Sequence, residues 1–153
     1  MSDLKLKKSL QEAGIFYVAL AAGVSGDFEQ CLVLIGEDIS QANLTAKVKK
    51  NRGVGDDLFS LAAVKDSEDV ATWQHLVDGQ TLQALPFGVE PDEETTITTI
   101  KLTASKATIS NAYDEINPQP GCIAYLDWEL VAGDPLNKIL ATGPFHITPG
   151  VVG

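Results

Sequence analysis

The chain has 153 residues, which is enough for one domain with a substantial hydrophobic core and too few to suggest two. It is acidic, with 21 aspartates and glutamates against 11 lysines and arginines, and its formal net charge is −10. Binding to nucleic-acid phosphates requires clustered cations, so we expect no nucleic-acid partner. The small basic clusters at residues 5–8 and 47–50 are expected to be solvated faces.

The first part of the N-terminal segment is predicted to be a short helix. Residues 3–13 contain good helix formers, with Leu4 and Leu10 as apolar anchors and Gly14 placed to end them. The sequence IFYVALAAG that follows predicts either a strand or an apolar connector, because its periodicity does not decide between them. A charged region before an apolar one imitates an export signal, but Glu12 interrupts it. About ten apolar residues are also too few to span a bilayer, so we expect no export and no membrane partner.

From residue 27 onward, alternating apolar and polar residues separated by turn residues predict short strands. Strands are expected at residues 27–36, 44–50, 58–64, 96–105, 123–131 and 139–148, with a short edge segment at 81–88. A helical turn opened by Asp66 or Ser67 is expected before that edge segment, and an acidic loop after it. Pro144 cannot donate to a β-ladder, so the last hairpin is expected to lie at an edge or a corner.

These elements predict an all-β protein with a β-sandwich fold, Ig-like or jelly-roll-like, and a short N-terminal arm or helix. We expect an arm at residues 1–26 and the sandwich domain at residues 27–153. The inward strand faces predict a core made of Leu32, Leu34, Leu44, Val48, Leu102, Leu126, Trp128, Leu130 and Phe145.

The sequence offers little for catalysis or metal binding. His75 and His146 are far apart, and neither has metal-ligand spacing. The GVSG at 23–26 lacks the spacing and context of a nucleophile elbow. Acidic groups at 56–57 and 90–94 could surround a hard cation, but without fixed ligand spacing a solvated loop is the preferred interpretation. We therefore expect no enzyme activity, no cofactor and no metal.

Cysteines and tryptophans have structural interpretations. Cys31 and Cys122 are too few for a metal cluster or a disulfide-rich scaffold, and we expect buried thiols, with a disulfide left open as the alternative. Trp128 shares a strand face with Leu126 and Leu130 and is assigned to the core. Trp73 has polar neighbours and could be an exposed contact.

Three stretches of the chain follow the pattern of one protein family. FEQCLVLIGEDISQANLTAKVKK matches an opening strand, a turn and a basic-ended strand, with an additional SQAN, and TTIKLTASKATIS matches a central strand. The closing hairpin matches at Tyr125, Asp127, Leu130, Leu140, Gly143, Phe145, Ile147, Pro149 and Val151. Over residues 27–152 the chain therefore resembles β-sandwich domains of tailed bacteriophages, as found at the N-terminus of baseplate upper proteins and in small virion proteins. It departs from them in its N-terminal extension, an additional residue between Tyr125 and Asp127, and an Asp-Pro after the turn glycine.

The resemblance implies a non-enzymatic structural protein of a phage particle. Such a protein would be made in the cytoplasm of the host bacterium. It would join the virion as a homo-oligomer, through contacts with tail, baseplate or neck proteins. A head decoration protein that binds the major capsid protein is the alternative. A carbohydrate-binding sandwich, from another class, would need an exposed aromatic platform, for which Trp73, Phe87 and Tyr113 are the candidates.

Ordering a free N-terminal arm costs conformational entropy, which the arm can recover only by burying apolar side chains. The arm could bury them on its own sandwich or on a neighbouring protein. Because the matched domain has its strands without the arm, we expect docking on a neighbour. The assembly contacts predicted on this basis are Leu4, Leu10, Ile15, Phe16, Tyr17, Val18 and Leu20.

Overall fold

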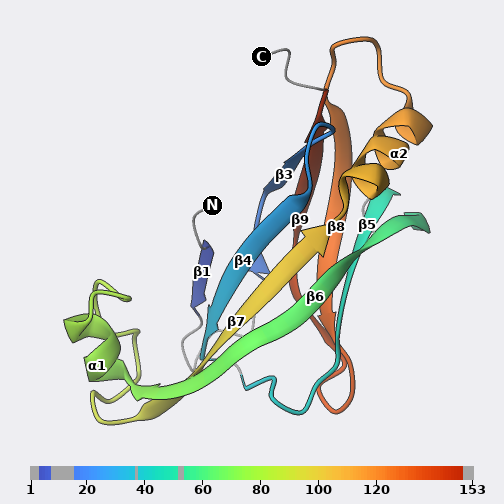
Figure 1. Cartoon of the computed structure of the whole chain (residues 1–153). Helices are drawn as coiled ribbons and strands as arrows, with labels where there is room; N and C mark the ends of the chain where they lie inside the picture. The colour runs from blue at the N-terminus through green and yellow to red at the C-terminus, as the bar shows by residue number, and fades with distance from the viewer. Residues whose placement is uncertain (1–3, 8–15, 37, 52–53, 150–153) are drawn as a thin grey trace.

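The structure is a computed structural model that describes residues 4–7, 16–36, 38–51 and 54–149. These residues form nine strands and two helices (Figure 1). The strands are β1 (Leu4–Lys7), β2 (Phe16–Tyr17), β3 (Leu20–Gly23), β4 (Phe28–Ile35), β5 (Leu44–Asn51), β6 (Val54–Thr72), β7 (Glu94–Ala104), β8 (Ala124–Ala132) and β9 (Lys138–Thr148). The helices are α1 (Trp73–Asp78) and α2 (Lys106–Ile116).

All of these strands belong to one continuous mixed sheet, in the order β1-β4-β7-β6-β5-β8-β9-β2, with β3 also paired to β9. The sheet curls into two facing layers. Layer A consists of β1, β4, β7 and residues 62–72 of β6, and layer B consists of residues 54–61 of β6 with β5, β8, β9, β2 and β3. The expected all-β sandwich is confirmed, and β6 joins its layers because it belongs to both (Figure 1).

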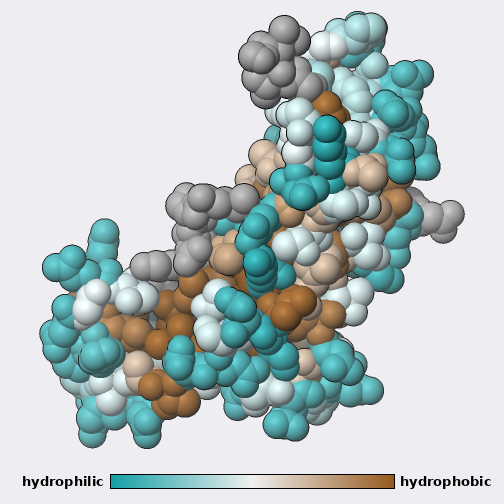
Figure 2. Space-filling view, viewed as in Figure 1, coloured by the Kyte–Doolittle hydropathy of each residue, from teal (hydrophilic) through white to brown (hydrophobic). Residues whose placement is uncertain are grey.

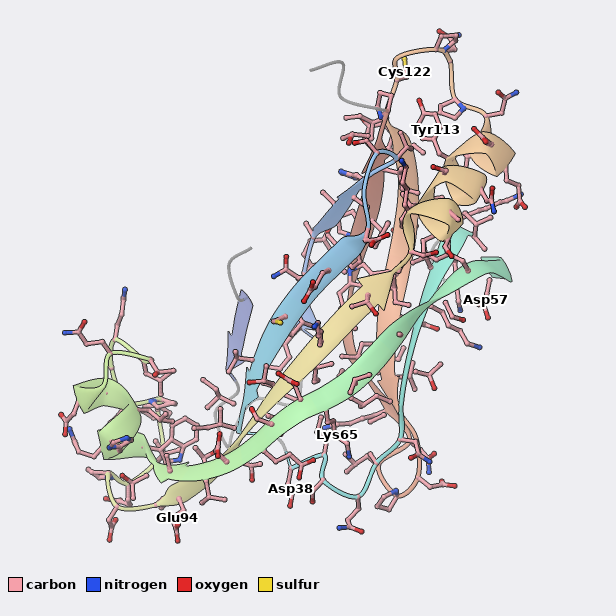
Figure 3. All side chains as sticks on the ribbon, viewed as in Figure 1. Asp38, Asp57, Lys65, Glu94, Tyr113 and Cys122 are labelled. Carbon is pink, nitrogen blue, oxygen red and sulfur yellow. The ribbon has the colours of Figure 1, made fainter. Side chains whose placement is uncertain are left out.

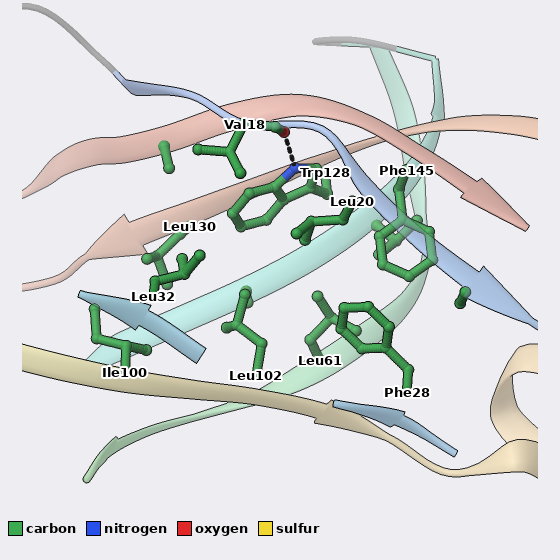
Figure 4. Close-up of a cluster of buried hydrophobic side chains, with 14 of the residues drawn as sticks. Val18, Leu20, Phe28, Leu32, Leu61, Ile100, Leu102, Trp128, Leu130 and Phe145 are labelled. Carbon is green, nitrogen blue, oxygen red and sulfur yellow. Dashed lines mark hydrogen bonds between the residues drawn. The ribbon is translucent and has the colours of Figure 1, made fainter. Parts of the chain in front are cut away.

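The main core lies between the layers. Leu32 and Leu102 from layer A face Trp128 and Leu130 from layer B, as the alternation of each strand predicted (Figure 4). Every residue of the predicted core is buried except Leu44, which is half-buried and packs against the others. Phe145 contacts the rings of Phe28 and Phe59 edge to face, at centroid distances of 5.2 and 5.7 Å.

Residues 4–7 form strand β1, so the helix predicted over residues 3–13 is wrong for this part. β1 runs parallel to β4, with Leu4 opposite Leu32 and Lys7 opposite Ile35. Leu and Lys alternate in this segment, and this period of two fits a strand better than the helical spacing that links Leu4 to Leu10. Residues 8–15 lie outside the described residues.

β2 and β3 run parallel to β9 on the far edge of layer B. The two ends of the curled sheet therefore both come from the N-terminal segment, with β1 on layer A and β2 and β3 on layer B (Figure 1). Within residues 16–23, Val18, Leu20 and Ala22 are buried in the main core. These residues are part of the same sheet and core as the residues that follow, across the boundary expected at residue 26.

Between β2 and β3, the chain makes a close contact with β9. The main chain of Val18 lies against Gly143, where a Cβ atom would be 2.1 Å from the Val18 carbonyl oxygen. That oxygen accepts a 2.8 Å hydrogen bond from Nε1 of the buried Trp128, and the Val18 N–H donates to Thr142 O at 2.8 Å (Figure 4). The parallel pairing with β9 stops after Thr142 and resumes at Phe145, and Pro144, which has no N–H to donate, lies in this interruption. β9 is therefore paired on both sides, so of the edge or corner position that Pro144 predicted, the edge is wrong.

β6 is longer than the predicted strand 58–64 and includes the segment expected to hold a helical turn from Asp66 or Ser67. A bulge between Lys65 and Ser67 shifts its register on β7. Helix α1 begins only at Trp73, where the Thr72 hydroxyl accepts the N–H of His75. Residues 81–88 form turns rather than an edge strand.

Helix α2 was not expected from the sequence. Its Ser105 cap accepts the N–H of Thr108, and Asn117 ends it in the left-handed conformation with φ 51°. Ile109 and Ala112 enter the main core from this helix. The helix thus covers one end of the sandwich, where Asp27 accepts the N–H of Lys106.

Gly143→Ala should lower the free energy of unfolding by more than about 1 kcal/mol, because the new methyl group would overlap the Val18 carbonyl. Gly26→Ala is the matched control, since a Cβ at Gly26 meets no atom within 4 Å. Urea unfolding of both variants checks this. Equal stabilities would show that the main chain of Val18 is not held against Gly143.

Candidate functional site

The outer face of layer B carries exposed apolar side chains, and we call it the B face. Tyr17, Tyr125 and Ile139 are exposed there, at 70%, 66% and 37%. Strand register places them on one side of the layer, because Tyr17 lies opposite Thr142, Tyr125 opposite His146, and Ile139 opposite Val131. Exposed aromatic side chains of this kind favour protein contacts.

An ion-pair network occupies the middle of the B face. Lys47 lies 3.0 Å from Asp57, and Lys49 bridges Asp57 at 4.0 Å and Glu129 at 3.0 Å. The hydrogen bond from Lys49 to Glu129, and then the negative charge of Glu129, raise the pKa of Lys49 above its ordinary value. Beside the network, the rings of Tyr125 and His146 meet edge to face at 4.7 Å. The B face therefore combines a fixed polar centre with apolar surroundings.

A second exposed region is the lobe, which we define as residues 66–97. In Figure 1 it projects from one end of layer A and carries α1. Its small core consists of the buried Trp73, Leu76 and Leu82, together with Ile35 of β4. Ile35 and Ile97 are neighbours on β4 and β7, on the face of layer A opposite to the main core. Trp73 is 1% exposed, so the exposed contact considered for it is wrong.

Lys65 of β6 binds a loop at residues 38–43. The Lys65 Nζ donates to the carbonyl oxygens of Ile39, Ser40 and Ala42 at 3.0–3.1 Å and lies 3.6 Å from a Glu68 carboxylate oxygen (Figure 3). Within this loop, Asp38 Oδ1 accepts the hydroxyl of Ser40 at 2.7 Å and its N–H at 3.0 Å. The hydroxyl bond first, and the N–H bond second, lower the pKa of Asp38.

Other polar groups serve local structure. A shallow depression beside the start of α2 contains Glu29 and Lys101, which pair at 2.9 Å; this contact raises the pKa of Lys101. Cys31 and Cys122 are both free, but Cys31 is half-buried and Cys122 is exposed, so burial of both thiols was wrong. The Tyr113 hydroxyl donates to the Cys122 carbonyl at 2.6 Å (Figure 3). Within the described residues, no group of three or more His, Cys, Asp and Glu side chains is placed to hold a metal ion.

The predicted assembly contacts fall into different places. Val18 and Leu20 are buried in the chain's own core, and Phe16 packs against it, whereas Tyr17 is exposed on the B face. Of the others, Leu4 lies in β1, and Leu10 and Ile15 lie outside the described residues. The docking of the arm on a neighbour stays a prediction, but burial leaves Val18 and Leu20 unavailable for it in this conformation.

The three aromatic candidates for a carbohydrate platform do not share an exposed surface. Trp73 is buried in the core of the lobe, while Tyr113 packs against the main core. Phe87 is 83% exposed. A flat stacking platform needs rings that are exposed together, and the structure brings none of these three together in that way.

Comparisons with known proteins provide little guidance. No family model and no curated protein matches the chain. Among solved structures, it is similar to the cysteine protease inhibitor EhICP2 from Entamoeba histolytica, at 7% identity and a TM-score of 0.29, over 95% of this chain and 94% of that one. It is also similar to PbICP-C, solved in complex with falcipain-2, at 8% identity and a TM-score of 0.32, over 95% and 98%. TM-scores this low carry no inference about function. Neither helix of the described chain is long and apolar enough to cross a membrane.

Replacing Ser40 by alanine should raise the pKa of Asp38 toward its ordinary value, because the carboxylate loses its hydroxyl donor. The contribution of Asp38 to stability is present above its unfolded-state pKa and is lost as the pH falls through its lower folded-state pKa. The Ser40→Ala variant should therefore lose this contribution at a higher pH. NMR titration of the Asp38 carboxyl carbon measures the change, with Ser60→Ala as control, and an unchanged pKa would refute the assigned cause.

Proposed function

We propose that the chain is a non-enzymatic structural protein of a bacteriophage particle, which assembles through protein–protein contacts in the tail, baseplate or neck. The observation that carries the proposal is the closing hairpin, β8–β9, whose residues follow the phage β-sandwich pattern. In that hairpin Leu130, Phe145 and Ile147 are core residues, and Gly143 admits the main chain of Val18. The packing of the sandwich therefore depends on several of the matched positions.

The B face supplies a contact surface for this role. Tyr17, Tyr125 and Ile139 expose apolar area on a face that strand pairing holds in place. Burial of such apolar side chains against a partner removes them from water and so stabilises the complex. We infer that the B face contacts either a second copy or another virion protein.

Decoration of the head is the second candidate for the same surface. A decoration protein would use the B face against the major capsid protein, and the two candidates differ in copy number and position on the particle. Many copies spread over the head, rather than a few rings on the tail, would support this alternative.

Quantitative mass spectrometry of purified particles, with immunogold electron microscopy, tests the proposal. We expect the chain in the particles, at a copy number that fits rings on the tail. A chain absent from particles purified from the producing lysate would refute a virion role.

A Tyr125→Ser/Ile139→Ser variant should enter particles less well, because it removes two apolar side chains from the B face. Val64→Ser is the matched control, since Val64 is 57% exposed but lies on layer A. Normal incorporation of the double variant, with its thermal stability unchanged, would show that the B face is not the contact surface.

A further inference from the structure

Phe87 is the most exposed large apolar side chain among the described residues, at 83%. It lies in a turn closed by a 3.4 Å hydrogen bond from the Val89 N–H to the Pro86 carbonyl. Gly88 has φ 87°, as the third residue of a type II turn requires. The ring therefore contributes little to the chain's own core, although the main chain that carries it has a defined conformation.

The residues on both sides of this turn are anchored. Leu85 and Val89 pack against the core of the lobe, which contains Trp73 and Leu82. Leu82 and Thr81 donate their N–H groups to the Leu76 carbonyl at 3.1 and 2.9 Å. The first N–H groups of α1 donate to the segment just before β7, with the Trp73 N–H donating to the Glu93 carbonyl at 3.0 Å. Because the main chain that carries Phe87 is already ordered, binding costs little main-chain conformational entropy, which favours a role of the ring as an interface anchor.

The lobe around Phe87 is strongly acidic. Residues 66–97 include eight aspartates and glutamates and no lysine or arginine. The lobe therefore carries most of the net charge of −10 of the whole chain. Hydrophilic residues cover the outer end of the lobe in Figure 2, and apolar residues show between them and the rest of the molecule. Lys65, at its base, pairs with Glu68. A partner that covers Phe87 would approach this negative charge and needs cations of its own.

A second copy of the chain carries the same net charge of −10, which opposes its approach to the acidic lobe. Lys47 and Lys49 on the B face already pair with Asp57 and Glu129. The same holds for Lys50 and Lys101, which pair with Glu115 and Glu29. A contact between copies through these lysines would exchange existing ion pairs for new ones and bring two acidic chains together.

We propose that the lobe is a docking site in which Phe87 packs against apolar side chains of a different protein, and that lysine or arginine side chains flank these apolar residues in the partner. The ring supplies the anchor that becomes buried, and the acidic residues of the lobe steer and orient the flanking cations. The site is separate from the B face, so the proposal does not depend on the phage assignment.

A displayed library of short random peptides tests this proposal on the full-length protein. Peptides selected for binding should be enriched in lysine or arginine next to apolar residues. Phe87→Ser should weaken their binding by at least about tenfold, as for an interface hot spot. Raising the salt concentration should weaken binding further, since the charges of the lobe would be screened.

Two variants serve as controls. Tyr125→Ser removes a similarly exposed ring from the B face and should leave peptide binding unchanged. Phe87→Leu keeps an apolar side chain and should retain part of the affinity. Both Phe87 variants should keep the thermal midpoint of the unmodified chain, because the ring is exposed. The proposal would be overturned if no peptides were enriched, if they lacked an excess of cations, or if they bound Phe87→Ser as well as the unmodified chain.

Discussion

The carbonyl of Val18 lies where three parts of the chain meet. It rests on Gly143 of β9, it accepts the indole N–H of Trp128 from β8, and its own strand segment joins β2 to β3. A side chain at Gly143 would separate these main chains, and without Trp128 the buried carbonyl would lose its donor. The burial of Val18 and Leu20, and therefore the closure of this side of the sandwich, depends on this contact.

The protection of the sheet edges follows from the same arrangement. β9 would be an edge strand without β2 and β3, and β4 would be one without β1. Open edges invite pairing with other chains, so native proteins usually cover or charge them. Here the N-terminal segment covers both with short strands, so that β1 on one layer and β2 and β3 on the other become the edges. On the opposite side β6 turns from one layer into the other. The remaining exposed segment of β6 carries Asp66, Glu68 and Asp69, whose charges disfavour pairing between copies.

The strands with strict alternation could be predicted from the sequence. In β8, for example, Leu126, Trp128 and Leu130 all face the core because each second residue points inward. The length of β6 could not be predicted, since Ser67, Glu68 and Asp69 are exposed there and carry no apolar pattern. Helix α2 had a signal that alternation obscured: Ile109, Ala112, Tyr113 and Ile116 have helical spacing after the Ser105 cap. Tyr17 and Phe87 were among the contact residues predicted from the sequence, but so were Val18 and Trp73, which are buried. Only tertiary packing decides which of these residues is exposed.

The parallel pairing of Phe16 with Ala141 and of Leu20 with Phe145 joins segments from opposite ends of the sequence. During synthesis, the apolar residues of β2 and β3 emerge from the ribosome long before β9 exists. Contacts between residues so distant in sequence form slowly, because a long loop must close before they add stability. Until then Val18 and Leu20 remain uncovered and are exposed to misassociation with other nascent chains. The sandwich is therefore completed late, and folding of its N-terminal side must wait for translation of β9.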